Sequence, residues 1–193
     1  MKSFLTPDQP RIDSYKLGTK ILADKFYPTN MVTFWRGGTY PACCVDEIIE
    51  YTGLKVDHIA IRTKRTKVGD NYEIQIFQLG YLVERLTKDS KLLIVDDIFD
   101  SGLTIEAFIN ELRKRLGNNF PNDIRIAVVD YKPDNNKTDR VPNYFVNVLP
   151  GSTWRQYCHE LEGLTIEEIE EHYGAEVADL VRQSYFNVNG KTL

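Results

Sequence analysis

The stretch KLLIVDDIFDSGLT, from Lys91 to Thr104, joins an apolar run to three acidic residues and then to a glycine-containing turn. A nearly continuous apolar run is typical of a strand covered on both faces of a sheet. In open α/β sheets, ligands bind beyond the carboxyl ends of the strands, and this run delivers Asp96 and Asp97 there. The turn offers backbone N–H groups, two hydroxyls and a helix start, and Gly102 leaves room beside them. Together these features predict a sugar-phosphate site.

A plainer interpretation is that the aspartates and the Ser-Gly pair only end a strand and cap a helix. Three aspartates within five positions are harder to explain in this way, because clustered carboxylates repel one another. A cation or a ligand rich in hydroxyls would relieve the repulsion. We therefore favour the functional interpretation.

The composition of the chain indicates the class of protein that carries this site. The 193 residues, 42% of them hydrophobic and 27% charged, predict one compact globular domain. No apolar run approaches the roughly 20 residues of a membrane span, and MKSFLTPDQPRID lacks the apolar core of a signal peptide. Adjacent Cys43 and Cys44 favour reduced thiols, and hence a cytoplasmic location. A net charge of -4 without a long basic run argues against nucleic acid as a partner.

The remaining pattern alternates strands with helices. Strand-like runs lie at 31–35, 57–62, 72–77, 91–97, 124–131 and 144–149, and helical patterns lie at 12–26, 41–51 and 104–116. Thr165 to Glu168 has the form of a capping box that opens a helix toward residue 171, resuming after Gly174. The alternation predicts an α/β domain with a mainly parallel sheet, and the turn-rich 132–143 predicts a surface loop.

The Lys91–Thr104 stretch resembles the 5-phosphoribosyl-1-pyrophosphate (PRPP) signature of type I phosphoribosyltransferases. The resemblance, which covers about residues 30 to 162, implies a mainly parallel central sheet flanked by helices, with a small hood over the active site. It implies one domain over 1–193, with hood elements from about 132–162 and from the N-terminus. It also implies that Asp96 and Asp97 bind the ribose hydroxyls and, indirectly, a PRPP-bound Mg²⁺. The implied 5-phosphate cradle is Ser101, Gly102, Leu103 and Thr104.

Three further segments extend the resemblance. In FWRGGTYP, residues Arg36, Gly37 and Gly38 resemble the pyrophosphate loop of 6-oxopurine enzymes, often with a cis peptide, although RGG alone can be a simple turn. Lys132 resembles the lysine that donates to the 6-oxo group of the base, although a lysine after a strand is usually solvated.

The segment VNVLPGSTWRQYCHE (146–160) resembles the hood of bacterial xanthine-guanine enzymes. The resemblance implies that Trp154 stacks on the purine, that backbone groups near Arg155 read its 2-position, and that Glu160 is the acidic residue of the hood. The alternative for Trp154 is a core tryptophan.

The family pattern fails at RTKRTKVGDNY (62–72), where a mobile catalytic loop with a Ser-Tyr pair is expected. The stretch carries Lys64, Arg65 and Lys67 instead, which are cationic enough to meet pyrophosphate. The alternative is a solvated hairpin between two strands. Both interpretations stay open at this stage.

The resemblance implies a purine-salvage phosphoribosyltransferase that joins the phosphoribosyl group to N9 of hypoxanthine, guanine or xanthine, with Mg²⁺ and as a homodimer or homotetramer. Asp100 would exchange a proton with N7 of the purine, unless it only caps the following helix. One rival is a non-catalytic PRPP-sensing regulator on the same fold. Another is a receiver domain or a metal-dependent phosphatase, since VDD at a strand end can hold Mg²⁺.

Overall fold

The computed structural model describes residues 2–6, 8–68 and 71–192. The chain divides into two compact units: unit 1 comprises Met1–Pro10 and Ser152–Leu193, and unit 2 comprises Arg11–Gly151. The assignment of 1–193 to a single domain stays a prediction. No helix in the described part of the chain is long and apolar enough to span a bilayer.

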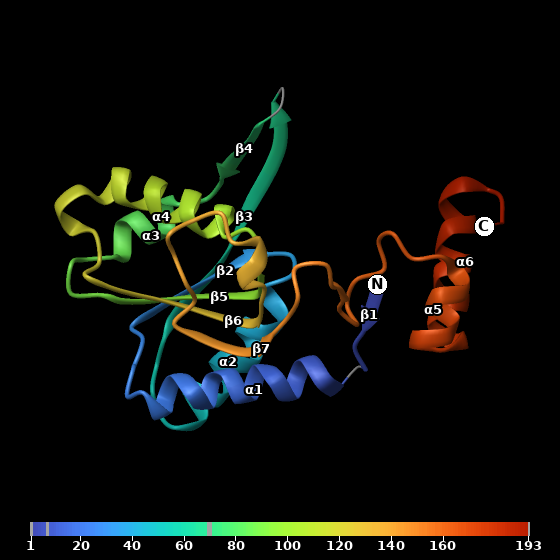
Figure 1. The fold of residues 1–193 in the computed structure, drawn as a ribbon, viewed down its shortest axis with the longest axis horizontal. Coiled ribbons are helices and arrows are strands. Elements are labelled where there is room, and N and C mark those ends of the chain that lie inside the picture. The colour runs from blue at the N-terminus through green and yellow to red at the C-terminus, as the bar shows by residue number, and fades with distance from the viewer. Residues whose placement is uncertain (1, 7, 69–70, 193) are drawn as a thin grey trace. The chain divides into compact units, whose positions relative to one another are not determined.

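Unit 2 is built on a six-stranded sheet with the order β4-β3-β2-β5-β6-β7 (Figure 1). All neighbours are parallel except β3 and β4, so the predicted α/β class with a mainly parallel sheet is confirmed. The strands are β2 (Asn30–Trp35), β3 (Asp57–Val68), β4 (Asn71–Ile76), β5 (Lys91–Phe99), β6 (Asp123–Tyr131) and β7 (Tyr144–Val148). The helices are α1 (Asp8–Ala23), α2 (Thr39–Tyr51), α3 (Gly80–Arg85) and α4 (Leu103–Leu116), with 3-10 turns η1 (Gly117–Asn119) and η2 (Pro133–Asn135).

The apolar run of β5 is explained by its position between two layers of helices. Leu92 and Ile94 belong to the core cluster that includes residues of α3 and α4, whereas Leu93 and Val95 belong to the cluster that includes residues of α1 and α2. Figure 1 shows these two pairs of helices on opposite faces of the sheet. Both faces of β5 are thus buried, and its carboxyl end lies at the sheet centre, between β2 and β6.

The stretch expected as a mobile loop is folded differently from that expectation. β3 continues to Val68 and pairs with antiparallel β4, with Thr63 opposite Ile76, so Lys64, Arg65 and Lys67 lie on a strand. β4 lies beside α4, since Glu73–Ile76 and Ala107–Lys114 contribute to the lining of one cavity, and the hairpin projects beyond the sheet in Figure 1. Residues 69 and 70, the predicted flexible turn, lie outside the described residues. The secondary structure is therefore that of the hairpin alternative, and the role of its cations stays open.

Unit 1 contains a two-stranded parallel sheet of β1 (Lys2–Phe4) and β8 (Trp154–Gln156), followed by α5 (Ile166–Tyr173) and α6 (Ala175–Asn189). The predicted capping box is present: the backbone N–H of Glu168 donates to Thr165 Oγ1 (3.2 Å), and the Thr165 N–H donates to Glu168 Oε2 (3.0 Å). Sequence reasoning missed β1, α3 and β8, because elements this short carry no periodic signal.

Candidate phosphoribosyl site

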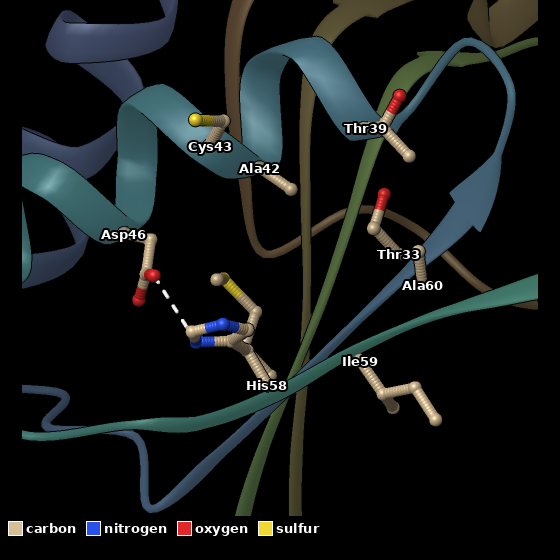
Figure 2. A pocket seen from close by; sticks show the side chains of 9 residues that line it. Thr33, Thr39, Ala42, Cys43, Asp46, His58, Ile59 and Ala60 are labelled. Carbon is tan, nitrogen blue, oxygen red and sulfur yellow. Dashed lines mark ion pairs between the residues drawn. The ribbon is translucent and has the colours of Figure 1, made fainter.

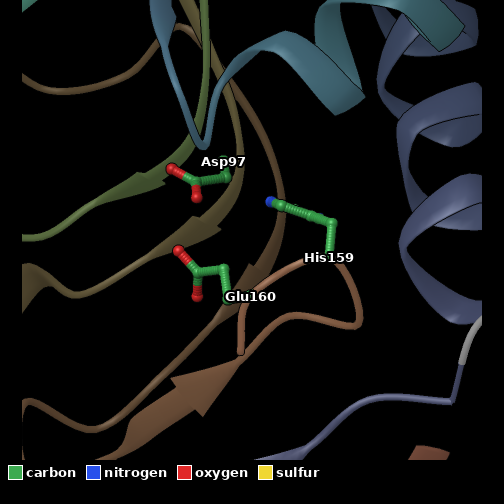
Figure 3. A group of neighbouring side chains, drawn as sticks. All are labelled: Asp97, His159 and Glu160. Carbon is green, nitrogen blue, oxygen red and sulfur yellow. The ribbon is translucent and has the colours of Figure 1, made fainter. Parts of the chain in front are cut away.

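Asp96 and Asp97 lie inside β5, near its carboxyl end, rather than after the strand. The backbone N–H of Asp97 donates to Asp96 Oδ1 (3.1 Å), and the N–H of Ile98 donates to Asp97 Oδ1 (2.8 Å). Figure 3 shows the Asp97 carboxylate at this end of the strand. These local bonds turn each carboxylate back along its own backbone.

The loop Arg36–Gly38 connects β2 to α2 and packs directly on both carboxylates. A Cβ atom on Gly37 would overlap the Asp97 carboxylate, and one on Gly38 would lie 2.5 Å from Asp96 Oδ1. Only glycine permits this approach, because any side chain would collide with a buried acid. The Trp35–Arg36 peptide bond is cis, as the resemblance implies for this loop. The structure thus brings the expected pyrophosphate loop and the expected ribose-binding acids together.

Electrostatics support a ligand between these elements. Burial, and then the neighbouring charge of Asp97, hold the pKa of Asp96 well above its usual value. A cation or a set of hydroxyl donors would relieve this repulsion. Carboxylate oxygens are ligands that Mg²⁺ prefers, and proteins often bind Mg²⁺ through one or two carboxylates together with the phosphates of a substrate. The acidic pair therefore fits the implied metal.

The turn after β5 has the form expected of a phosphate cradle. Gly102 has φ +73° and precedes α4, whose first turn has no side-chain cap. A Cβ atom there would lie 2.5 Å from Phe99 Cζ. The turn lines a cavity of about 240 Å³ that also receives Arg65 from the hairpin. The remaining lining residues are Asp96, Asp97, Ile98, Phe99, Asp100, Ser101, Thr104 and Ile105.

Asp100 lies in a polar network with the segment after β6. Lys132 Nζ donates to Asp100 Oδ2 (3.3 Å), and Asn135 Nδ2 donates to Asp100 Oδ1 (2.7 Å). Lys132 is only 6% exposed, so the alternative of a solvated loop lysine is wrong. Sequence reasoning missed Asn135, because an asparagine in a turn-rich segment is ordinary turn chemistry.

The residues expected in the hood lie in unit 1. Trp154 is 63% exposed on β8 and donates from Nε1 to Gln156 Oε1 (3.3 Å), so it is not a core tryptophan of that unit. Arg155 donates to Ser3 Oγ (3.0 Å). The segment that follows β8 carries His159 and Glu160 (Figure 3), and the Glu160 N–H donates to the Tyr157 carbonyl (3.0 Å). The structure therefore gathers Arg36–Gly38, the β5 acids, the phosphate turn and Lys132 in unit 2. It assigns Trp154, Arg155 and Glu160 to unit 1.

A second cavity of about 190 Å³ lies between α2 and strands β2 and β3 (Figure 2). His58 Nδ1 lies 3.1 Å from Asp46 Oδ2, and burial raises the pKa of Asp46 while the His58 charge opposes the rise. Thr33 Oγ1 and Asp46 Oδ1 are buried without a hydrogen-bond partner among the described residues. No sequence pattern pointed to this cavity, since its residues come from three separate elements.

Comparisons with known proteins agree with this geometry. The family model of the phosphoribosyl transferase domain matches residues 35–159. A purine phosphoribosyltransferase from Pyrococcus horikoshii is 26% identical with a TM-score of 0.65, over 85% of this chain and 97% of that one. A protein from Neisseria gonorrhoeae with bound ppGpp is 20% identical with a TM-score of 0.71, over 94% and 98%.

A hypoxanthine phosphoribosyltransferase from Staphylococcus aureus is 20% identical with a TM-score of 0.61, over 76% of each chain. A search of curated proteins finds no match. The type I phosphoribosyltransferase fold is therefore confirmed by the family model and by the solved structures.

Proposed function

Since the chain belongs to the phosphoribosyl transferase domain family, we propose that it transfers the 5-phosphoribosyl group of PRPP to N9 of a 6-oxopurine, releasing pyrophosphate. The proposal is supported by one observation above all, the pairing of Lys132 with Asp100 at 3.3 Å. A 6-oxopurine carries an acceptor, O6, beside N7, which loses or gains a proton. An ammonium beside a carboxylate matches these two atoms, whereas the 6-amino group of adenine would face the ammonium with a second donor.

In the proposed reaction, Asp96 and Asp97 accept from the ribose hydroxyls and hold C1 over the glycine loop. Backbone N–H groups of the Ser101–Thr104 turn donate to the 5-phosphate, assisted by the N-terminal end of α4. Arg36 and the loop amides meet the pyrophosphate. Bound Mg²⁺ would supply positive charge to the departing pyrophosphate.

Asp100 would move the proton at N7 as N9 attacks C1 through an oxocarbenium-like transition state. Lys132 would donate to O6, which orients N7 toward the carboxylate. Trp154 would stack on the base, and backbone groups near Arg155 would read its 2-position. Glu160 completes the proposed base site. Of the three hairpin cations, Arg65 would meet pyrophosphate, a proposal supported by its place in the lining of the 240 Å³ cavity, and Lys64 and Lys67 would flank it.

Assays of PRPP consumption with hypoxanthine, guanine, xanthine, adenine and orotate test the substrate class. At least one 6-oxopurine should form a nucleotide, with adenine and orotate much poorer, and we expect xanthine or guanine to be accepted along with hypoxanthine. Rates with adenine comparable to those with the oxopurines would contradict the role given to Lys132. The proposal also includes purine salvage, a cytoplasmic location and a homodimer or homotetramer.

The alternative is a non-catalytic regulator that binds PRPP as a signal. Calorimetric titration of PRPP beside steady-state rates separates the two functions. Asp100→Asn should lower turnover by about 10²-fold or more while PRPP still binds, because proton transfer alone is lost. Asp96→Ala with Asp97→Ala should instead weaken PRPP binding. A protein that binds PRPP but turns over none of the bases would be the regulator.

A further inference from the structure

We propose that Asn135 is a positioning residue that holds the Asp100 carboxylate at the purine. The inference rests on the proposed function and adds a residue that neither the sequence pattern nor the family motif pointed to. The inference is based on the hydrogen bonds of one side-chain amide, and the residues that form these bonds all belong to unit 2.

The Asn135 amide nitrogen makes two hydrogen bonds. It donates to Asp100 Oδ1 (2.7 Å) and to the Gly151 carbonyl (2.9 Å). An amide NH₂ has two N–H groups, so both bonds form at once and the side chain is fixed at two points. Gly151 also fits this arrangement, because a Cβ atom there would overlap Asn135 Oδ1. The amide therefore holds Asp100 on one side and the turn leading into unit 1 on the other.

Asp100 needs such a partner because its side chain is 46% exposed. Lys132 occupies Oδ2, at a longer 3.3 Å, and in the proposed function this ammonium turns to the base. Once it does so, the hydrogen bond from Asn135 still holds the carboxylate. A carboxylate released into solvent would lose its alignment with N7, and a misplacement of about 1 Å can reduce a rate about 10²-fold.

The local backbone does not depend on this amide alone. The Lys137 N–H donates to the Ser101 carbonyl (3.0 Å), and the Asn135 N–H donates to the Lys132 carbonyl (3.2 Å). The neighbouring Asp134 Oδ2 accepts from the Gly151 N–H (3.3 Å). This bond makes a second link between η2 and the turn at Gly151. In the described part of the chain Asp134 forms no hydrogen bond with Asp100, which makes Asp134→Ala a matched control.

The experiment compares kcat and KM of the full chain with Asn135→Ala, Asp134→Ala, Asp100→Asn and the double variant Asp100→Asn/Asn135→Ala. Asn135→Ala should lower kcat about 10-fold or more with little change in KM for PRPP, whereas Asp134→Ala should lie within about twofold of the parent. In the Asp100→Asn background, Asn135→Ala should have little further effect, because the group that it positions no longer accepts the proton. An equal loss in both backgrounds, or an equal loss in Asp134→Ala, would overturn the inference.

The coupling of the two residues is also measured without turnover. Urea unfolding of the parent, Asn135→Ala, Asp100→Ala and Asp100→Ala/Asn135→Ala gives a double-mutant cycle for the two residues, with alanine at position 100 because an asparagine there would still accept the hydrogen bond. Coupling in that cycle supports the contact, and its absence overturns the inference whatever the activity. If the parent forms no nucleotide from any base, the proposed function fails on its own, and the cycle still decides whether Asn135 holds Asp100.

Discussion

Replacing Gly102 with alanine adds a single Cβ atom to the turn before α4, the proposed phosphate cradle. The added Cβ lowers the stability of the folded protein in two ways. A residue other than glycine at φ +73° in the left-handed region costs about 1–2 kcal/mol. The Cβ would also lie 2.5 Å from Phe99 Cζ and 2.7 Å from Cε1, and overpacking of this kind costs about 1–3 kcal/mol. The Phe99 ring has little room to retreat, because it is 1% exposed and packs edge-to-face against Tyr131 with ring centroids 5.7 Å apart.

The expected loss in the free energy of unfolding is therefore about 2–5 kcal/mol, the sum of the two costs. Gly53 provides the matched control in the same unit: its φ is +90°, and a Cβ there would have no atom of the described chain within 4 Å. Gly53→Ala should thus show only the conformational cost of about 1–2 kcal/mol. Urea unfolding followed by circular dichroism measures both values. Equal losses in the two variants would show that the Phe99 contact carries no cost, and the reasoning would fail.

Three further changes test other parts of the molecule. Asp96→Asn should raise the unfolding free energy near pH 7. A raised pKa means that the folded protein holds a proton which the unfolded chain releases, so stability falls as pH rises from the usual aspartate value through the raised one. The gain should therefore vanish in urea titrations at or below about pH 4, and a gain independent of pH would refute this cause. Arg65→Ala should lower turnover more than it lowers purine affinity, and hydrogen exchange at 63–68 should slow with PRPP and Mg²⁺; unchanged exchange and normal turnover would leave the hairpin purely structural. Thr165→Ala should destabilise unit 1 by about 0.5–2 kcal/mol in thermal unfolding, since it removes the capping box that includes Glu168; no change would mean that α5 does not depend on its cap.

The sheet and its main helices could be predicted because their signals are local. The continuous apolar run of β5 follows from burial on both faces, and Ile105, Phe108, Ile109 and Leu112 form the buried stripe of α4 at helical spacing. The stretch from Thr63 to Val68 gave no such signal, because its polar residues do not alternate with apolar ones and its strand geometry depends on pairing with β4.

The candidate site was predictable only where its residues are contiguous. The acids and the phosphate turn fall in one run of chain, and their order matched a known signature. The burial of Lys132 and the bridge made by Asn135 depend on contacts between β5 and the segment after β6, which no local pattern encodes. The stacking of Trp154 on the base stays a prediction, because Trp154 belongs to unit 1 and the other candidate residues belong to unit 2.

The β3–β4 hairpin has a consequence for solubility. β3 pairs with β2 only as far as Arg62, so within the described residues its continuation from Thr63 to Val68 pairs with β4 alone. That continuation has no second strand beside it among the described residues, and a strand edge of this kind can template association with a strand from another molecule. Lys64, Arg65 and Lys67 place positive charge along this edge, and charged edge residues are a common means by which proteins prevent such stacking. Neutralising all three should therefore promote self-association, and this requirement on the hairpin sequence is separate from the proposed contact of its cations with pyrophosphate.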